Sequence, residues 1–457
     1  MRRLTACLLA LLATAAAPEP GAPVRHEEGR LSNGNAWVVD VPPNWNGTLL
    51  LFSHGYSPVQ GPARNKPRGG AEMLLARGYA LAGSSYSQGG WSLEAAVPDQ
   101  IAALDAVAAR IGKPRRVLAY GESMGGLVTA ALVERYPDRI DGALPMCASV
   151  SGVVGMENQG LDGAWALKTL VDPQAPLRIV GIWRPGEPAP PIREEGPAVD
   201  ALIAKARATP QGRARLALAA AFAQLPDHPD DQAPPPGSPD LDARVDAYAR
   251  WFAMGVFFPR YDQERRAGGN ASWNTGVDYA AQLAASRKRA EVEALYRRAG
   301  LDLTADLATL ARAPRVSADP KAVAYMRANF VPSGKLKRPV LTVHTTGDRA
   351  TMVTYEQAYA DAVRRAGAGA MLRQAYVQAP GHCTFTAGET VAAIETLDRR
   401  VATGRWEPAR LSPDALNAAA GAAGGAAGRY VAFIPPRFLR PCGAAPGSCP
   451  GEPAPAR

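Results

Sequence analysis

The stretch Arg116-Val-Leu-Ala-Tyr-Gly-Glu-Ser-Met-Gly-Gly126 decides the fold of this chain. It reads as a short apolar strand, then Gly121-x-Ser123-x-Gly125, then a helix pattern that stops at Pro137. In this context Gly-x-Ser-x-Gly is the pattern of a nucleophile elbow, whose turn is so tight that the residues two before and two after the serine must be small. The alternative is a glycine-rich turn without chemistry.

Strands and helices alternate on both sides of this stretch, with the spacing of a parallel α/β sheet. The strand at 48–53 is a continuous apolar run, as expected for a strand buried on both faces. Further strands are expected at 36–41, 79–85, 142–147, 339–344, 372–378 and 430–434, and helices at 72–77, 93–111, 355–366 and 387–403.

The alternation breaks after Ser149, and no convincing buried strand follows until 339. Two proline-rich stretches, 184–197 and 226–239, lie in this region, with helices expected at 198–208, 212–224, 242–254 and 279–299. Its aromatic residues form a helical core, and some of them are candidates to line a pocket: Trp165, Trp183, Trp251, Phe252, Phe257, Phe258 and Trp273.

We therefore expect a mostly parallel α/β sheet flanked by helices, with a large helical cap inserted after the strand that ends near Cys147. The expected division is a signal peptide at 1–17, a core in two parts at 18–149 and 336–405, a cap or lid at 150–335, and a C-terminal extension at 406–457 with Ala/Gly- and Pro-rich segments.

The N-terminus has the pattern of a cleavable export signal, with Arg2 and Arg3, an apolar run, and small residues up to Ala17. The apolar run is too short for a stable membrane anchor. The formal net charge is +9, with scattered arginines and no long basic run, so nucleic acid is not expected as a partner. We expect a secreted or periplasmic protein.

Four cysteines remain once the leader is excluded, and an even number in an exported chain permits disulfides. Cys442 and Cys449 lie close together and are the natural first pair. Cys147 and Cys383 then pair with each other or stay as thiols. No spacing resembles a zinc site, and no metal or nucleotide motif is present, so no cofactor is expected.

A serine nucleophile needs a base, and the base needs an orienting acid. Among the five histidines, His382 lies just past a late strand, while His344 lies within a buried strand as a core residue. Asp348 ends the preceding strand. Because the carboxyl ends of parallel strands meet at one edge of a sheet, we expect Ser123, Asp348 and His382 to come together there.

These motifs resemble the α/β-hydrolase superfamily over roughly 30–150 and 335–405: His54-Gly55, Gly121-Glu-Ser-Met-Gly125, Gly347-Asp348 and Gly381-His382 in this order. Within it, the chain looks most like exported bacterial serine esterases with a large helical lid. The His382-Cys383 pair is similar to the tannase and feruloyl esterase group, where a cysteine beside the histidine bonds one beside the serine. Glu122 stands at that second position here, which argues against membership and leaves Cys147 as the candidate partner of Cys383.

The resemblance implies acyl transfer, with Ser123 as nucleophile, His382 as base and Asp348 as orienting acid. The oxyanion donors would be the backbone N–H of Met124 and that of Tyr56, or else the Tyr56 hydroxyl, as in prolyl-oligopeptidase-like relatives. Tyr56 as an ordinary loop aromatic is the alternative. His54 is expected to shape the oxyanion loop.

The activity expected is hydrolysis of a small-molecule or oligomeric carboxylic ester. A serine exopeptidase or prolyl-type peptidase is the first alternative, which would use an acidic or basic anchor; Glu194, Glu195, Asp230 and Asp231 are candidates. A non-catalytic binding protein on the same scaffold is the second. Neither the ester nor the oligomeric state follows from the sequence.

Overall fold

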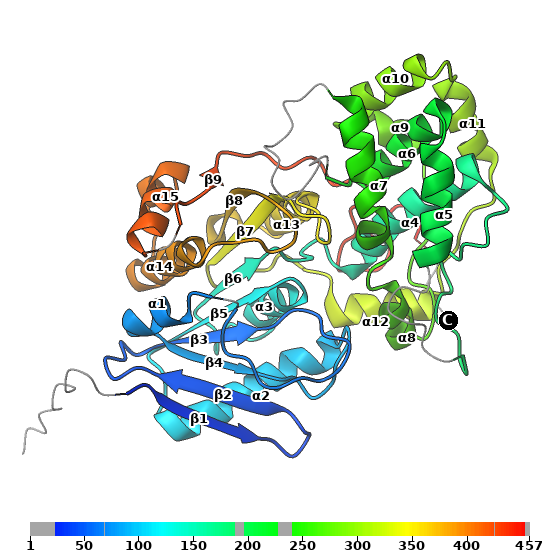
Figure 1. Ribbon diagram of the computed structural model, residues 1–457. Helices are drawn as coiled ribbons and strands as arrows, with labels where there is room; N and C mark the ends of the chain where they lie inside the picture. The colour runs from blue at the N-terminus through cyan, green and yellow to red at the C-terminus, as the bar shows by residue number, and fades with distance from the viewer. Residues whose placement is uncertain (1–22, 68, 188–195, 227–239, 425, 453–457) are drawn as a thin grey trace, which may run out of the picture.

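The computed structural model describes residues 23–452, apart from 68, 188–195, 227–239 and 425 (Figure 1). The expected signal peptide and its cleavage site near Ala17 lie outside the described residues. The two proline-rich stretches of the insertion also lie largely outside them.

Within the described residues, a sheet of nine strands organises the molecule, in the order β1-β2-β4-β3-β5-β6-β7-β8-β9. The strands from β4 to β8 in this order are parallel, and the pairs β1–β2, β2–β4 and β8–β9 are antiparallel. The strands are β1 Arg25–Arg30, β2 Ala36–Val41, β3 Thr48–Ser53, β4 Ala80–Ser84, β5 Arg116–Glu122, β6 Gly142–Met146, β7 Val340–Gly347, β8 Leu372–Pro380 and β9 Tyr430–Val431.

Helices cover both faces of this sheet because its central strands are apolar on both sides. In β3, Leu49 and Leu51 pack into one core cluster, and Leu50 and Phe52 into the other. The first cluster includes side chains of α2 (Leu93–Ile111), α3 (Met124–Arg135) and α13 (Thr354–Arg365), and the second those of α1 (Ala71–Ala76) and α14 (Ala387–Thr403). This is the α/β-hydrolase fold that the sequence predicts.

Helices α4 to α12 run between β6 and β7 and form a helical body beside the sheet (Figure 1). The helix expected at 279–299 is two helices in the structure, separated at 285–288. The bounds are α4 Val153–Val171, α5 Gly196–Arg207, α6 Pro210–Phe222, α7 Leu241–Phe257, α8 Arg260–Ala267, α9 Tyr279–Ala284, α10 Arg289–Arg298, α11 Leu303–Arg312 and α12 Pro320–Phe330.

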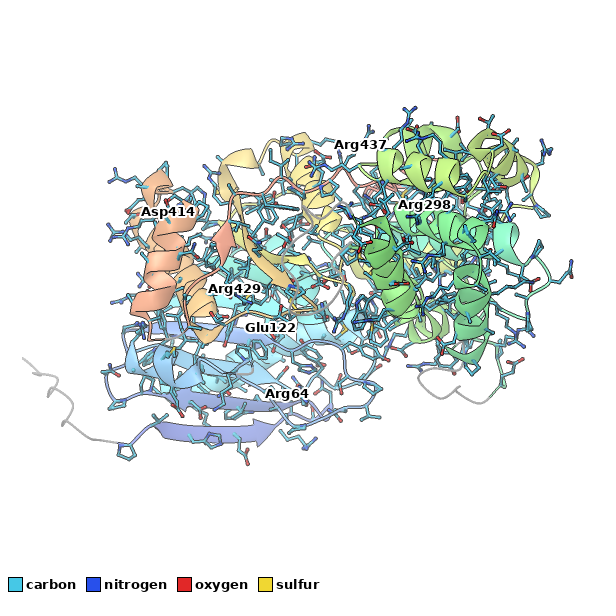
Figure 2. The ribbon with its side chains drawn as sticks, turned by 45° about the horizontal axis from the view of Figure 1, so that its top comes forward. Arg64, Glu122, Arg298, Asp414, Arg429 and Arg437 are labelled. Carbon is cyan, nitrogen blue, oxygen red and sulfur yellow. A yellow bond between two sulfur atoms is a disulfide. The ribbon has the colours of Figure 1, made fainter. Side chains whose placement is uncertain are left out.

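The C-terminal segment crosses from the sheet to this helical body. Figure 2 shows Asp414 on α15 (Pro413–Ala422) at the far end of the core and Arg437 next to the inserted helices. The buried guanidinium of Arg440 pairs with Asp162 of α4 and donates to the Trp273 carbonyl. The segment therefore ties the insertion to the sheet. Short 3₁₀ helices lie at Gly369–Met371 and Pro408–Arg410.

Among the helices that the structure describes, none combines the length and the apolar character needed to cross a membrane.

Candidate active site

Ser123 lies in a strained turn between β5 and α3. Its φ is 59°, which a side-chain-bearing residue adopts only when the surrounding structure enforces it. A Cβ at Gly121 would lie 2.5 Å from the Gly125 carbonyl oxygen, and one at Gly125 would lie 2.0 Å from that of Ser53. Both positions therefore require glycine because backbone approaches them closely, as the sequence predicts for an elbow.

The structure brings the three residues singled out in the sequence together at the carboxyl ends of β5, β7 and β8. His382 Nε2 lies 2.8 Å from Ser123 Oγ. His382 Nδ1 lies 2.8 Å from Asp348 Oδ2 and 3.0 Å from Oδ1. This arrangement allows the imidazole to take the serine proton while the carboxylate fixes its tautomer.

Asp348 accepts hydrogen bonds from the turn that follows it as well as contacting His382. Its Oδ1 accepts hydrogen bonds from the backbone N–H groups of Ala350 and Thr351, both at 2.9 Å. Burial alone would raise the pKa of this carboxyl, but the adjacent His382, and next His344, hold the pKa below its ordinary value. Asp348 is therefore an anion in the folded protein near neutral pH.

Thr351 is a part of this arrangement that sequence reasoning did not identify. Its Oγ1 lies 3.0 Å from Asp348 Oδ2 and 2.8 Å from the Cys147 carbonyl oxygen, so its single proton goes to one of the two. The available signal was local, since an aspartate side chain commonly accepts hydrogen bonds from the backbone two or three residues later.

The loop after β3 passes against the serine. A Cβ at Gly55 would lie 3.3 Å from Ser123 Cβ. His54 donates from Nδ1 to the Gly55 carbonyl oxygen at 2.7 Å, and its ring stacks on Tyr86 at 4.0 Å. Burial lowers the pKa of His54. His54 thus shapes this loop as a neutral residue.

The Tyr56 ring packs among aromatic side chains, 5.1 Å from the ring of Phe258 and 6.5 Å from that of Trp91. Burial, and next the negative charge of Asp262, raise the pKa of Tyr56 to about 12. The hydroxyl is therefore protonated at neutral pH. The charges that act on it belong to α8 of the insertion: Asp262, Arg265 and Arg266.

A disulfide joins Cys147 and Cys383, whose Cα atoms are 5.4 Å apart. Its Cys383 Sγ lies 3.4 Å from His382 Nε2. The sequence left these two cysteines as a pair or as thiols, and the structure pairs them. Cys442 and Cys449 form the second disulfide, as expected from their proximity.

The end of α7 lies across the site. On the serine side Phe258 contacts Tyr56, and on the acid side the Arg349 guanidinium stacks on Trp251, 3.4 Å from the ring centroid. A Cβ at Gly255 would lie 2.8 Å from Met352 Cε. Helix α7 and Phe258, the residue that follows it, therefore contact loops on both flanks of the site.

The aromatic residues of the insertion fall into two groups. Trp165, Phe252 and Trp273 are buried in its core. The others are at least partly exposed: Trp183, Trp251 and Phe257 are half-buried, and Phe258 is 37% exposed beside Tyr56. The four acidic residues considered as peptide anchors lie outside the described residues: Glu194, Glu195, Asp230 and Asp231.

A cleft of about 650 Å³ opens between the insertion and the core on the acid side of the site. Asp348, Thr346 and Met352 line it, together with Glu291 and Lys288 of the helical body. Ser123 is not among its lining residues, so this cleft does not by itself form a substrate pocket.

Comparison with solved structures finds similarity to esterases and peptidases. Feruloyl esterase B from Aspergillus oryzae matches with a TM-score of 0.41 and 14% identity, over 83% of this chain and 80% of that chain. An esterase from Pyrococcus furiosus matches with a TM-score of 0.38 and 11% identity, over 84% of this chain and 92% of that chain.

No known protein-family profile matches the chain. A curated relative does: it is 32% identical to an o-phthalyl amidase from Xanthobacter agilis over 434 residues, which is 89% of this chain and 94% of the relative. The match therefore spans the sheet, the inserted helices and the elbow together. The chain is a hydrolase that belongs to the family of this o-phthalyl amidase.

Proposed function

We propose that the protein is a serine hydrolase in which Ser123, His382 and Asp348 form the catalytic triad. The observation that carries this proposal is the continuous chain of contacts from Ser123 Oγ through the His382 imidazole to the Asp348 carboxylate. His382 takes the serine proton as Ser123 Oγ attacks a carbonyl carbon, and it then gives that proton to the leaving group. Water releases the acyl group from Ser123 in a second, equivalent step.

The backbone N–H groups of Met124 and Tyr56 are the proposed donors to the oxyanion. The close approach of Gly55 to Ser123 supports the second donor, because Tyr56 follows directly in the chain. Its hydroxyl is a weaker candidate, since the ring packs against Phe258 and the hydroxyl is influenced by charges on α8. Donors fixed in the backbone need no reorganisation when the oxyanion forms.

The bond cleaved is proposed to be an amide of an aromatic acid, such as an o-phthalyl amide. The relative's name and its coverage of nearly the whole chain support this assignment. The ring pair of Tyr56 and Phe258 supports an aromatic acyl group, because Tyr56 directly follows Gly55, which lies against Ser123, and because edge-to-face ring contacts stabilise such pairs.

Carboxylic esters are the second candidate substrates, in line with the expectation from the sequence. The same triad accepts them, and an alkoxide or phenoxide departs more readily than an amine, so esters of the same acids should also react. A peptidase role is the third candidate, and its candidate anchors lie outside the described residues.

The insertion is proposed to act as a lid, and the mature protein to be exported. The contacts of α7 with both flanks of the site support the lid. The two disulfides support export, because disulfides persist in oxidising compartments. The leader that would direct export lies outside the described residues.

A substrate panel tests the assignment. We expect the purified protein to release amine from N-(2-carboxybenzoyl) amino acids and phenol from phenyl esters of the same acid. Ser123→Ala should remove both activities. Faster cleavage of prolyl or aminoacyl nitroanilides than of either aromatic series would replace the proposed substrate class with a peptidase one. Cleavage of the esters alone would favour the second candidate.

A further inference from the structure

A second histidine, His344, lies close to the acid of the proposed triad. His344 is on β7, four residues before Asp348, and its side chain is fully buried. Its Nε2 lies 3.9 Å from Asp348 Oδ2, the oxygen that is also 2.8 Å from His382 Nδ1. Asp348 thus has two imidazole rings near its carboxylate, those of His344 and His382.

The hydrogen-bond partners of His344 define where its protons are. Nε2 lies 2.8 Å from the Thr351 carbonyl oxygen, which can only accept, so Nε2 carries a proton. Nδ1 lies 3.2 Å from Glu356 Oε1. A carboxylate facing an unprotonated ring nitrogen would be repelled, so a second proton lies between these two atoms.

The surroundings of Glu356 favour its charged form. This side chain is 1% exposed, and its Oε2 accepts hydrogen bonds from the Thr342 hydroxyl and the Gln374 amide. Donors aimed at a carboxylate stabilise the anion. The shared proton therefore belongs on the ring, which makes the pair an imidazolium and a carboxylate.

We propose that His344 is a positioning residue for the triad: a buried imidazolium, paired with Glu356, that holds the Asp348 turn and presents positive charge to the Asp348 carboxylate. The proposal rests on the proposed function, since Asp348 is taken as the triad acid. Through the Thr351 carbonyl, His344 fixes the turn whose N–H groups at Ala350 and Thr351 bind Asp348.

The pKa values agree with this geometry. Burial alone would lower the pKa of His344, but the hydrogen bond and charge of Glu356, and then Asp348, raise it above its ordinary value. The charged or titratable groups around this cluster are those of Asp348 and His382 on the loops, Glu356, Tyr355 and Tyr359 on α13, and Tyr376 on β8.

This charge affects the base. Losing the positive charge near Asp348 in His344→Gln should let His382 keep its proton to higher pH than in the wild type. In His344→Gln, the acid limb of the pH–rate profile for the reaction at Ser123 should then move to higher pH by roughly 0.5–1 unit. The plateau rate should also fall several-fold, because the Asp348 turn loses an anchor.

The test has two readouts. In the wild type labelled with ¹⁵N-histidine, the His344 ring, assigned by its loss in His344→Gln, should show two protonated nitrogens at neutral pH. The second readout is the rate at which an uncharged fluorophosphonate labels Ser123 as a function of pH. His26→Gln is the matched control. His26 lies on the edge strand β1, and its Nδ1 is 2.6 Å from the Asp40 carboxylate. This variant should leave the acid limb of the pH–rate profile unchanged.

A neutral His344 ring in the wild type, or an unchanged acid limb and plateau in a folded His344→Gln protein, would overturn the proposal. If His344→Gln does not fold, Glu356→Gln is the second variant. It keeps the His344 ring, which should become neutral, and it should also move the acid limb of the pH–rate profile to higher pH. Should the wild type fail to react with the fluorophosphonate, the proposed function fails, whereas the ring spectrum still decides the state of His344.

Discussion

The disulfide between Cys147 and Cys383 ties the end of β6 to the residue that follows His382, across 236 residues of sequence. Both cysteines have positive φ, 42° and 56°, as does Ser123 at 59°. Strained backbone of this kind persists where the surrounding structure enforces it, often at functional sites. The disulfide therefore holds in place the loop that carries the proposed base.

Removal of this disulfide should impair both stability and reaction. We expect Cys147→Ser/Cys383→Ser to lower the free energy of unfolding by roughly 2–5 kcal/mol, because the long loop is no longer closed in the unfolded chain. The rate of fluorophosphonate labelling should drop as the His382 loop loosens. Urea unfolding and labelling kinetics measure the two effects.

The matched control is Cys442→Ser/Cys449→Ser, whose cysteines are seven residues apart in the C-terminal segment. It should have a smaller effect on stability and none on labelling of Ser123. Equal labelling rates in all three proteins would contradict a positioning role for the Cys147–Cys383 bond.

Phe258 should contribute to acyl-group preference. Replacing it with alanine removes the edge-to-face contact with Tyr56, which follows the loop residue Gly55 next to the serine. We expect kcat/KM for aromatic acyl substrates to fall roughly 5- to 10-fold, which is about 1–1.4 kcal/mol and typical of one aromatic contact. Acetyl esters should be almost unaffected. Ile434→Ala, which removes another exposed apolar side chain, is the control, and an equal loss for both substrate classes would count against this role.

The His344–Glu356 pair should make stability depend on pH in a defined direction. The pKa of His344 is raised on folding, so its contribution is complete below the unfolded value of about 6.5 and is lost as pH rises through the folded value. The wild type should therefore exceed His344→Gln/Glu356→Gln in unfolding free energy by more at about pH 6 than at about pH 9. Urea titrations of both proteins measure this difference, and a gap that widens with rising pH would contradict it.

Arg440 should be essential for attachment of the C-terminal segment. Its guanidinium is buried against Asp162, which also accepts hydrogen bonds from Tyr279 and Gln282. We expect Arg440→Ala to cost roughly 3–5 kcal/mol of unfolding free energy, because the buried Asp162 charge loses its partner. Arg437 is exposed, and Arg437→Ala should change stability by only about 0.5 kcal/mol or less. Thermal or urea unfolding compares the two, and similar losses would argue against a specific buried pair.

The sheet could be predicted from the sequence because its parallel strands are continuous apolar runs. The strands expected around Leu50, Tyr120 and Leu341 are present, and α2 has the expected bounds. The first strand, β1, was not predicted, since its sequence Arg-His-Glu-Glu-Gly-Arg is polar and lies at an exposed edge. Hydrophobic pattern carries no signal for such a strand.

The inserted helices were less predictable. Helix α4 is buried on nearly all sides and contains Gly155, Gly160 and Gly163, so it shows no amphipathic stripe and has poor helix propensity. Tertiary packing decides it: a Cβ at Gly160 would lie 2.6 Å from the Val256 carbonyl oxygen of α7. The contact between the Tyr56 and Phe258 rings likewise joins segments that are far apart in the sequence, and no local sequence pattern predicts it.

The sequence predicted that Ser123, Asp348 and His382 lie together, because parallel strands place their carboxyl ends along one side of the sheet. Thr351 and the buried pair of His344 with Glu356 were not. A histidine in an apolar strand looks like a core residue, and its role follows only from the atoms that face it.

The most direct test of the central claim is peptide mapping of the protein after reaction with a fluorophosphonate. Nucleophilic activation of Ser123 by His382 and Asp348 predicts one adduct on the peptide that contains Ser123, absent in Ser123→Ala and formed at least about 100-fold more slowly in His382→Ala. A wild-type protein that does not react, or an adduct that persists in Ser123→Ala, would contradict the account.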